Sequence, residues 1–517
     1  MRRYLYMGVF FAGLVTLAAE LSASRLLGNY YGTSNLVWAS IIGLILIYLT
    51  TGYTLGGRWA DKSPHLRTFF LILAWAALLT GVIPLAARPI LRLSSQAFDQ
   101  MQIGTLLGAF ISVLLLFSAP IILLGTASPF AIRLAVEDKE HSGRVSGKIY
   151  AISTLGSFIG TFLPSLIMIP LVGTYRTFAI LGAMLLFIAM FGIWKTNGTS
   201  ALLKILWMPV ILALATLIGL KGNDKIALGL VFEDESQYNY IQVQHVNRYY
   251  LLRLNEGQGI HSIYHPDIDT YYGPWELILV APFFNPAPYD IKSVERIAIL
   301  GLAAGTSARQ VNIVYPHAII DGYEIDAKII DVGYEYFDLD FPNLNIFIED
   351  ARRGLSKSTH TYQIISIDVF RPPYIPWHLT TKEFFREVKN HLTDDGVMLI
   401  NIARIQDYRK LVDALAATIR SEFPCVYSCD IPGTFNTILF ASKQSTEITN
   451  LFANYSNLKS NPQTPKTLLQ AIELTTECIQ TAPYEGIVLT DDRAPVEWLI
   501  NTMIIDFFVS GKIEALQ

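Results

Sequence analysis

The feature that most constrains this chain is a series of long apolar runs, all of which lie before about residue 222. A helix needs roughly 20 apolar residues to cross the ~30 Å hydrocarbon core of a bilayer, and each run has about that length. We expect membrane-spanning helices at 4–27, 35–56, 69–87, 104–126, 147–171, 174–194 and 203–220. The first run is too long for a cleavable signal peptide. Residues 1–222 are therefore predicted to form a multi-pass helical domain, with the lipid bilayer as its partner.

The composition agrees with a membrane part and excludes other classes of protein. Hydrophobic residues make up 52% of the chain and charged residues only 16%, which is too apolar for a purely soluble protein. The net charge of -4 gives no basic field for phosphates, so no nucleic-acid partner is expected. Cys425, Cys429 and Cys478 are too few and too scattered for a disulfide scaffold or a four-ligand zinc site. The sequence therefore predicts no metal.

The fifth apolar run differs from the others because it is rich in Ser, Thr and Gly. Gly156 and Gly160 within it have the small-xxx-small spacing that lets membrane helices approach closely. We expect this run to be a packed inner helix of the bundle.

Basic residues cluster in alternate connections between the predicted spans, and such connections are typically cytoplasmic. The clustered residues are Arg2, Arg3, Arg58, Lys62, Arg67, Arg133, Lys139, Arg144, Lys148, Lys195 and Lys204. With seven spans, this pattern places the N-terminus inside and the second half of the chain outside.

From about residue 225 the pattern changes to short β-rich runs and then to alternating strands and helices. Alternation over 236–246 and 249–254, with a polar break at Asn247 and Arg248, predicts a β-hairpin. Further strands are expected near 296–301, 318–324, 344–348, 362–369, 396–402 and 435–441, with helices at 327–337, 381–391 and 406–420. This order predicts a mostly parallel, doubly wound Rossmann-like sheet.

Small or acidic residues follow four successive predicted strands. The turn from Gly301 to Gly305 includes Ala303, and its small side chains let backbone N–H groups come close to a ligand. The next three strands end near Glu324, Asp350 and Asp368. Each acid alone is more often a helix cap or a solvated loop residue. Together, at the edge where such sheets bind ligands, they predict a nucleoside site.

Several segments of the second half resemble the polyamine aminopropyltransferases, the spermidine synthase family, and the whole chain resembles their membrane-fused bacterial relatives. The segments are 235–238, 254–258, 299–305, 323–326, 349–352, 365–368 and 489–497. The resemblance implies a small β-domain with a connecting helix at 225–290, followed by a methyltransferase-like catalytic domain at 291–510.

The resemblance also implies a reaction and roles for residues. The family transfers an aminopropyl group from decarboxylated S-adenosylmethionine to an amine, usually putrescine, without a prosthetic group. Glu324 would hold the ribose hydroxyls, Asp350 the adenine amino group, and the turn from Gly301 to Gly305 the nucleoside and sulfonium. Asp368 would be the base, because an ammonium cannot attack carbon until it loses a proton. The implied acceptor pocket comprises Gln258, His261, Trp275, Glu276 and Arg371.

The sequence departs from the family pattern where the amine should bind. Ala304 stands where the family has an aspartate that meets the cationic tail of the donor, and Arg371 stands where it has a second acid. Pro274 and Trp275 replace a tyrosine and a histidine ahead of Glu276. Two anionic contacts are lost and a cation is gained, so a dicationic acceptor would meet like-charge repulsion.

Three functions remain after these departures. The first, which we favour, is aminopropyl transfer to an amine by a membrane-anchored enzyme. The second is methyl or other alkyl transfer from intact S-adenosylmethionine, and the third is a transporter or sensor whose nucleoside domain does not catalyse. A homodimer is a further option. Because S-adenosyl donors are made in the cytosol, we expect a cytoplasmic catalytic domain, which requires an even number of spans.

Overall fold

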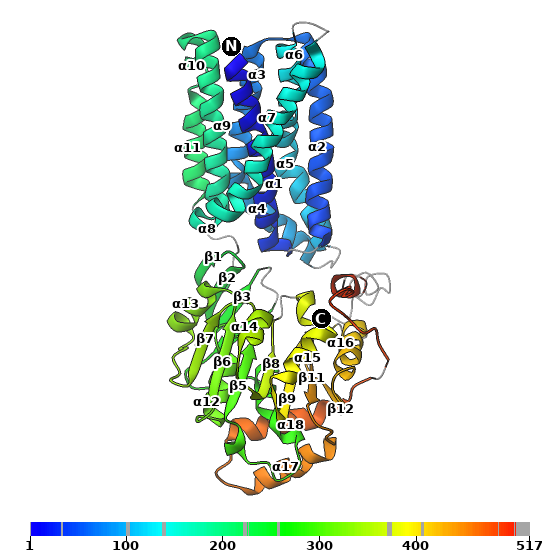
Figure 1. Cartoon of the computed structure of the whole chain (residues 1–517). Coiled ribbons are helices and arrows are strands. Elements are labelled where there is room, and N and C mark those ends of the chain that lie inside the picture. Colours follow the sequence, from blue (N-terminus) through cyan, green and yellow to red (C-terminus); the bar gives the residue numbers. More distant parts are fainter. Residues whose placement is uncertain are drawn as a thin grey trace. The chain divides into compact units, whose positions relative to one another are not determined.

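The structure is a computed structural model, and contacts along the chain divide it into two compact units. It describes residues 2–32, 35–99, 104–136, 141–220, 225, 227–255, 259–369, 375–404, 408–483, 485–500 and 502. One unit is Met1–Ile226 and the other is Ala227–Gln517 (Figure 1). Each is described by itself below.

The first unit is a bundle of apolar helices, as predicted. Its helices are α1 (Arg2–Tyr31), α2 (Asn35–Lys62), α3 (Leu66–Gly81), α4 (Ile83–Asp99), α5 (Gly104–Gly125), α6 (Ala127–Ala135), α7 (Ser142–Leu163), a π-helical turn (Pro164–Met168), α8 (Ile169–Val172), α9 (Thr174–Asn197), α10 (Thr199–Leu203) and α11 (Trp207–Gly219). Among the described residues, six helical stretches are long and apolar enough to cross a membrane. The pair α3 and α4, bent by 49°, makes a seventh if it counts as one span.

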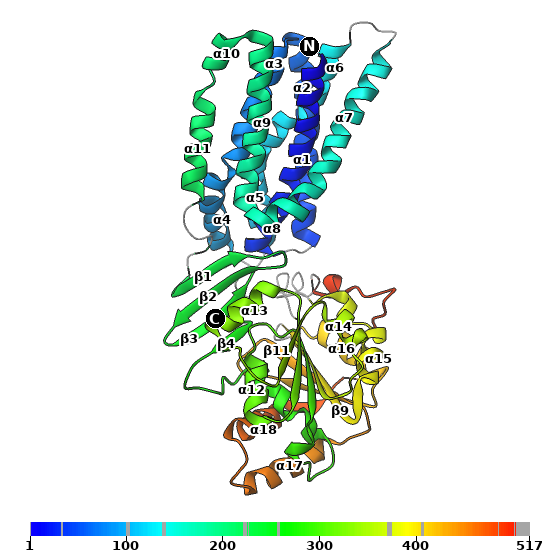
Figure 2. The ribbon, with the colours of Figure 1, turned by 60° about the vertical axis from the view of Figure 1, so that its left-hand side comes forward.

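The path of the chain through the bundle places its two ends apart. The N-terminus lies at the same end of the bundle as α6 and α10, whereas α8 and the last turn of α11 lie at the opposite end (Figures 1 and 2). The chain therefore enters the bundle at one end and leaves it at the other.

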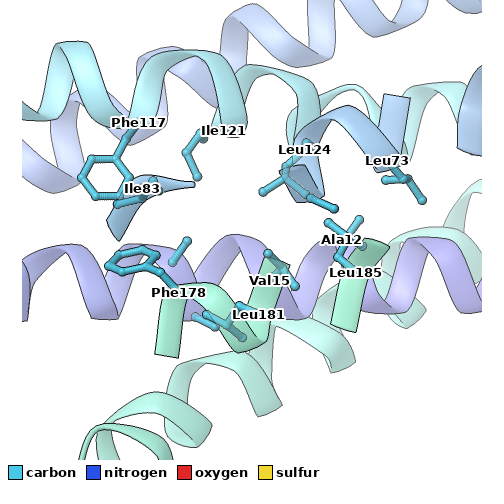
Figure 3. Packing of buried hydrophobic residues seen from close by; sticks show 14 of the residues in the cluster. Ala12, Val15, Leu73, Ile83, Phe117, Ile121, Leu124, Phe178, Leu181 and Leu185 are labelled. Atoms are coloured by element: carbon cyan, nitrogen blue, oxygen red, sulfur yellow. The ribbon is translucent and has the colours of Figure 1, made fainter. Parts of the chain in front are cut away.

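The core of the bundle is built around α1. Side chains of α5 and α9 lie against α1: Phe117 and Phe178 lie close to Ile83 of α4, and Val15 of α1 lies near Leu181 (Figure 3). The two rings lie 5.9 Å apart between centroids. Because lipid tails are as apolar as these side chains, close packing rather than water exclusion must hold such helices together.

Glycines set the distance between α1 and α7. A Cβ at Gly156 would lie 2.0 Å from the carbonyl oxygen of Phe10, and one at Gly160 would lie 2.1 Å from that of Leu14. The predicted close approach is therefore present. The expectation of an inner helix was wrong, because only this glycine face of α7 is buried and residues such as Phe158 are 61% exposed.

The contact between α1 and α7 yields a first prediction. Gly156→Leu should lower the melting temperature of the full chain in detergent by several degrees, because a side chain there collides with the α1 backbone. Gly147→Leu is the matched control on the same helix, since a Cβ at Gly147 meets nothing within 4 Å. Equal melting temperatures for the two variants would contradict this account of the packing.

The second unit begins with a four-stranded antiparallel sheet. Its strands are β1 (Leu230–Glu235), β2 (Tyr240–Val246), β3 (Tyr249–Leu254) and β4 (Ser262–Tyr264), in that order. The predicted hairpin is confirmed: β2 pairs with β3 and the turn residues Asn247 and Arg248 both have positive φ. Two successive left-handed residues match the twist of the flanking strands. A 3-10 helix, η3 (Pro274–Phe284), then leads toward the larger sheet.

The larger sheet has eight strands in the order β12-β10-β11-β9-β8-β5-β6-β7. The strands are β5 (Arg296–Leu300), β6 (Ile319–Glu324), β7 (Leu344–Ile348), β8 (Tyr362–Ile367), β9 (Leu392–Ala403), β10 (Cys425–Asp430), β11 (Asn436–Ser442) and β12 (Ile479–Thr481). The five strands from β9 to β7 are parallel, and the other three are antiparallel. The predicted Rossmann-like sheet is confirmed, with an antiparallel edge.

Helices cover both faces of this sheet (Figure 2). They are α12 (Thr306–Val314), α13 (Ala327–Tyr336), α14 (Ala351–Lys357), η5 (Trp377–Leu379), α15 (Lys382–Asn390), α16 (Lys410–Arg420), α17 (Ile448–Ser460) and α18 (Lys466–Cys478). Two apolar cores result: α14, α15 and α16 contribute to one, and α12, α17, α18 and η3 to the other. Because both faces are covered, the residues of β5 from Ile297 to Leu300 form a continuous apolar run in the sequence.

One disulfide joins Cys429 of β10 to Cys478 at the end of α18. The three cysteines do not make a disulfide scaffold, as expected from their number and spacing. The sequence analysis did not predict this single disulfide. The two cysteines are 49 positions apart in the sequence, and the chain between them folds back so that α18 ends beside β10. That proximity is a tertiary feature which spacing alone does not reveal.

Candidate active site

The turn after β5 forms the floor of the site, and its shape requires glycine. Gly301 has φ +91°, and a Cβ there would lie 2.2 Å from the carbonyl oxygen of Asp368. Gly305 has φ +89° and begins α12. Both positions lie in the left-handed region that glycine adopts without a steric penalty. The turn can therefore pass directly beside the end of β8.

Glu324, at the end of β6, is tied to this turn. The backbone N–H of Ala303 donates to Glu324 Oε2 at 3.0 Å, and the N–H of Asp326 donates to Oε1 at 3.1 Å. Burial raises the pKa of Glu324 to about 7, despite these hydrogen bonds. Hydrogen bonds donated by ligand hydroxyls stabilise a buried carboxylate of this kind more than they stabilise a solvated one.

The small sheet is fastened to the same turn by side chains that the sequence did not single out. Ser262 of β4 accepts a hydrogen bond from the N–H of Ala304 at 3.0 Å, and Thr306 Oγ1 bonds both the N–H and the C=O of Ile263. Asp326 Oδ2 accepts hydrogen bonds from the side chains of Ser236 and Asn239. Within this unit the two sheets are thus connected around the glycine turn.

Asp368 follows β8 and reaches the site beside Gly301. Its backbone N–H donates to the carbonyl of Leu300 at 2.8 Å, and its Oδ1 accepts a hydrogen bond from Asn401 Nδ2 at 3.1 Å. Burial raises the pKa of Asp368 to about 6, and the Asn401 bond opposes the shift. Such a carboxylate is a better proton acceptor than an exposed aspartate.

These elements surround a cavity of about 380 Å³. Among the candidate site residues, Gly301, Ala303, Asp368, His261 and Trp275 line it. Lining residues that the sequence analysis missed include Arg253, Tyr271, Asn401, Thr434 and Asn436. Asn401 was open to prediction, because it is a polar residue near the end of β9, the strand next to β8. Its Oδ1 is buried and has no hydrogen-bond partner among the described residues.

Four predicted site residues are not among those that line this cavity: Gly305, Glu324, Glu276 and Asp350. Glu276 is 1% exposed, and its carboxylate accepts hydrogen bonds from the backbone N–H groups of Tyr271 and Gly273 and from the Gln310 side chain. Burial raises the pKa of Glu276. These hydrogen bonds hold the loop before η3. The resemblance had implied that Glu276 would contact the acceptor.

Asp350 caps a helix and meets a histidine. Its Oδ1 accepts a hydrogen bond from the N–H of Arg353 in α14, and its Oδ2 lies 2.9 Å from His378 Nε2. The hydrogen bond to His378 is the main reason why the pKa of Asp350 is lowered. Beside it, Arg352 binds both carboxylate oxygens of Asp491 at 2.8 Å. The segments 349–352 and 489–497, singled out separately in the sequence, are therefore in contact.

Two predicted acceptor residues, Gln258 and Arg371, lie outside the described residues.

Comparisons with known proteins point to one family. Residues 286–453 match the model of the spermine/spermidine synthase domain. A probable polyamine aminopropyl transferase of Bifidobacterium longum is 30% identical over 284 residues, which cover 52% of this chain and 62% of that protein. A polyamine aminopropyltransferase of Vibrio vulnificus is 30% identical over 234 residues, which cover 43% of this chain and 75% of that protein.

A solved structure covers the same half. The crystal structure of a probable spermidine synthase from Corynebacterium glutamicum is 21% identical, covers 51% of this chain and 98% of that chain, and gives a TM-score of 0.39. The Vibrio vulnificus relative decides the family, because it is 30% identical and 75% of its length is covered. The chain belongs to the polyamine aminopropyltransferase (spermidine synthase) family, which is a family of transferases.

Glu324 provides a second prediction. Glu324→Ala should weaken binding of methylthioadenosine by about 1 to 3 kcal/mol, the range for hydrogen bonds to a charged group. Calorimetry on the full chain measures this affinity. Glu447→Ala, which changes an exposed acid outside the cavity lining, is the control and should bind normally. Unchanged affinity in Glu324→Ala would remove Glu324 from the site.

Proposed function

We propose that the chain transfers an aminopropyl group from decarboxylated S-adenosylmethionine to the nitrogen of an amine. The observation that carries the proposal is the contact between Gly301 and Asp368, because it sets a candidate base directly beside a turn suited to a nucleoside. Membership of the family supports the same reaction class. Putrescine, the usual acceptor of the family, is the reference substrate.

The proposed step is a direct displacement at carbon. The amine nitrogen forms a bond to the carbon beside sulfur, the C–S bonding pair goes to sulfur, and methylthioadenosine leaves. The acceptor enters as an ammonium, so its proton must be taken up, and Asp368 is the carboxylate on the cavity wall that would take it. Asn401 would hold that carboxylate through Nδ2, and its Oδ1 would accept a hydrogen bond from the amine.

The rest of the catalytic effect would come from alignment and electrostatics. Glu324 would accept the ribose hydroxyls, which fixes the donor on the turn at Ala303. The Asp368 carboxylate would also offset the positive charge of the sulfonium. Holding amine and carbon in line removes much of the entropic barrier to a reaction between two molecules.

Asp368 provides the third prediction. Asp368→Asn keeps the shape and removes the charge, so turnover should fall by about 10² or more while methylthioadenosine affinity is largely kept. In the unaltered enzyme, kcat/KM should fall as the pH drops below about 6, because the protonated carboxyl cannot accept a proton. Initial rates of methylthioadenosine release between pH 5 and 8 measure both effects.

Asp394→Asn is the control for this experiment, because the Asp394 side chain is 87% exposed. It should keep normal turnover and the same pH profile. Normal turnover in Asp368→Asn would mean that the chain shares the fold of the family but does not use Asp368 as the base. Turnover with intact S-adenosylmethionine alone would favour methyl or alkyl transfer instead.

We further propose that the first unit anchors the enzyme in the bilayer and that the catalytic half lies on the side opposite to the N-terminus. Three observations support this placement. The chain leaves the bundle at the end opposite to its start (Figures 1 and 2), and basic residues such as Arg58 and Arg133 follow the positive-inside rule for an inside N-terminus. The disulfide between Cys429 and Cys478 is typical of oxidising compartments. A cytoplasmic catalytic half would require an even number of membrane crossings. A catalytic half on the outer side requires that the donor reach the outer side.

The side of the membrane is the fourth prediction. A site for a specific protease, inserted in the exposed loop between Asn461 and Pro462, should be cut when protease is added to intact cells. The same site placed before Arg2 is the control and should be cut only after lysis. The reverse pattern, or protection of both sites, would restore the cytoplasmic placement.

A further inference from the structure

One continuous segment supplies more of the cavity wall than any other among the described lining residues. It comprises Tyr271, Tyr272, Gly273, Pro274 and Trp275, around the start of η3. We call residues 270–275 the wall loop. Asp368 lines the same cavity, so the position of the wall loop determines how much room an acceptor has beside the candidate base.

The wall loop has a backbone conformation that needs support. Tyr272 has φ +55°, in the left-handed region that residues other than glycine rarely adopt. The residue is 59% exposed, so packing in a core does not hold it there. Such a conformation persists only where neighbouring groups fix the chain around it.

Glu276 fixes the backbone of the wall loop on both sides of Tyr272. Its carboxylate accepts a hydrogen bond from the N–H of Tyr271, and another from the N–H of Gly273 at 2.9 Å. A helix cap at this position needs only the bond to Gly273, the residue that precedes η3. The bond to Tyr271 therefore goes beyond capping. Because hydrogen bonds to a charged acceptor are roughly twice as strong as neutral ones, the carboxylate holds the loop more firmly than an uncharged side chain would.

Two glutamines complete the support of the wall loop. Gln310 of α12 donates from Nε2 to Glu276 Oε1 at 2.8 Å, which fixes the carboxylate. Gln470 of α18 accepts a hydrogen bond from Thr270 Oγ1 at 3.0 Å and donates from Nε2 to the Tyr272 hydroxyl at 3.2 Å. Glu276 thus holds the backbone of the loop and Gln470 holds two of its side chains, although neither of these two residues lines the cavity.

We propose that Glu276 is a positioning residue for the acceptor and that it acts through the wall loop, without contact with the amine. Gln470 supports the same loop from α18. This inference rests on the proposed aminopropyl transfer and names residues that set its acceptor affinity. A loop released from Glu276 would leave the amine less closely aligned with the carbon beside sulfur, while Glu324 would still hold the donor.

The test separates the acceptor from the donor. The full chain carrying Glu276→Gln is supplied in detergent with putrescine and decarboxylated S-adenosylmethionine, and initial rates of methylthioadenosine release are measured. Glutamine keeps the shape, but its amide nitrogen cannot accept, so the N–H of Tyr271 or of Gly273 loses its partner. The KM for putrescine should rise and kcat/KM should fall by about 10-fold, as expected for loss of a charge-assisted hydrogen bond, while calorimetry should show methylthioadenosine affinity within about twofold. Loss of folded protein alone would instead lower kcat and the number of methylthioadenosine sites together, and would leave this KM unchanged.

Two further variants test the same loop. Gln470→Ala removes the bonds to Thr270 and Tyr272 without touching the buried carboxylate, and it should raise the KM for putrescine by a smaller factor. Glu473→Gln changes an exposed glutamate of the same helix, and as the matched control it should keep the unaltered KM. An unchanged KM in Glu276→Gln, or equal weakening of putrescine and methylthioadenosine, would overturn the inference. If Glu276→Gln does not fold, an unchanged KM in Gln470→Ala would overturn it.

Hydrogen exchange gives a readout that does not depend on turnover. Mass spectrometry of peptides that span the wall loop should show faster exchange in Glu276→Gln and in Gln470→Ala than in Glu473→Gln, because the loop opens more often when its hydrogen bonds are removed. Peptides that span β5 should exchange at the same rate in all three. Equal exchange of the wall loop in all three variants would overturn the inference by itself. Absence of product from the unaltered enzyme with every amine would instead count against the proposed function.

Discussion

Three parallel strands, β6, β5 and β8, end at one edge of the larger sheet, and the turn after the middle strand is held from both sides. The N–H groups of Gly301 and Leu302 both donate to the carbonyl of Tyr323 at 2.9 Å, and the N–H of Asp368 donates to Leu300 at 2.8 Å. A side chain at 301 would break this arrangement, because it would occupy the position of the Asp368 carbonyl. The backbone itself thus fixes the distance between the glycine turn and the candidate base, and the rest of the candidate site is arranged around that contact.

The acids near this edge fall into two groups by the partners that the fold gives them. Asp350 and Asp491 meet His378 and Arg352, and these partners lower their pKa values. Glu324 and Asp368 are instead buried with hydrogen bonds that do not offset the loss of solvent, so their pKa values rise. Groups held in an unfavourable ionisation state are common where a ligand or a proton is to be received. The fold therefore fastens its segments with one pair, and it is the other pair for which we propose a role in the reaction.

The first unit, which we propose anchors the enzyme in the bilayer, follows a different physical rule. Water does not drive apolar helices together in a bilayer, so the contact between α1 and α7 depends on how closely two backbones can approach. Gly13 and Gly156 face one another's helices, and a Cβ at Gly13 would lie 2.3 Å from the carbonyl of Ser153. The remaining faces of α7 need no partner within the chain, since apolar side chains such as Leu155 are stable against lipid tails.

Local patterns were enough to predict the long apolar helices, the hairpin turn at Asn247 and Arg248, the parallel strands and the residues that follow them. These depend on periodicity, on the conformations that turn residues allow, and on the rule that parallel strands end at one edge. Four strands were not predicted: β1, β4, β10 and β12. Of these, β4 and β12 have three residues each, which are too few to show a periodicity. Arg253 was also missed as a residue of the cavity wall, since nothing local distinguishes such a residue from one on a solvated face. Asn401 was missed although its position near the end of β9 could have indicated it. The sequence by itself determined the two-part architecture and the identity of the turn and its acids. Only the tertiary structure decided which polar side chains share the cavity, because that depends on how two sheets far apart in the chain pack around one glycine turn.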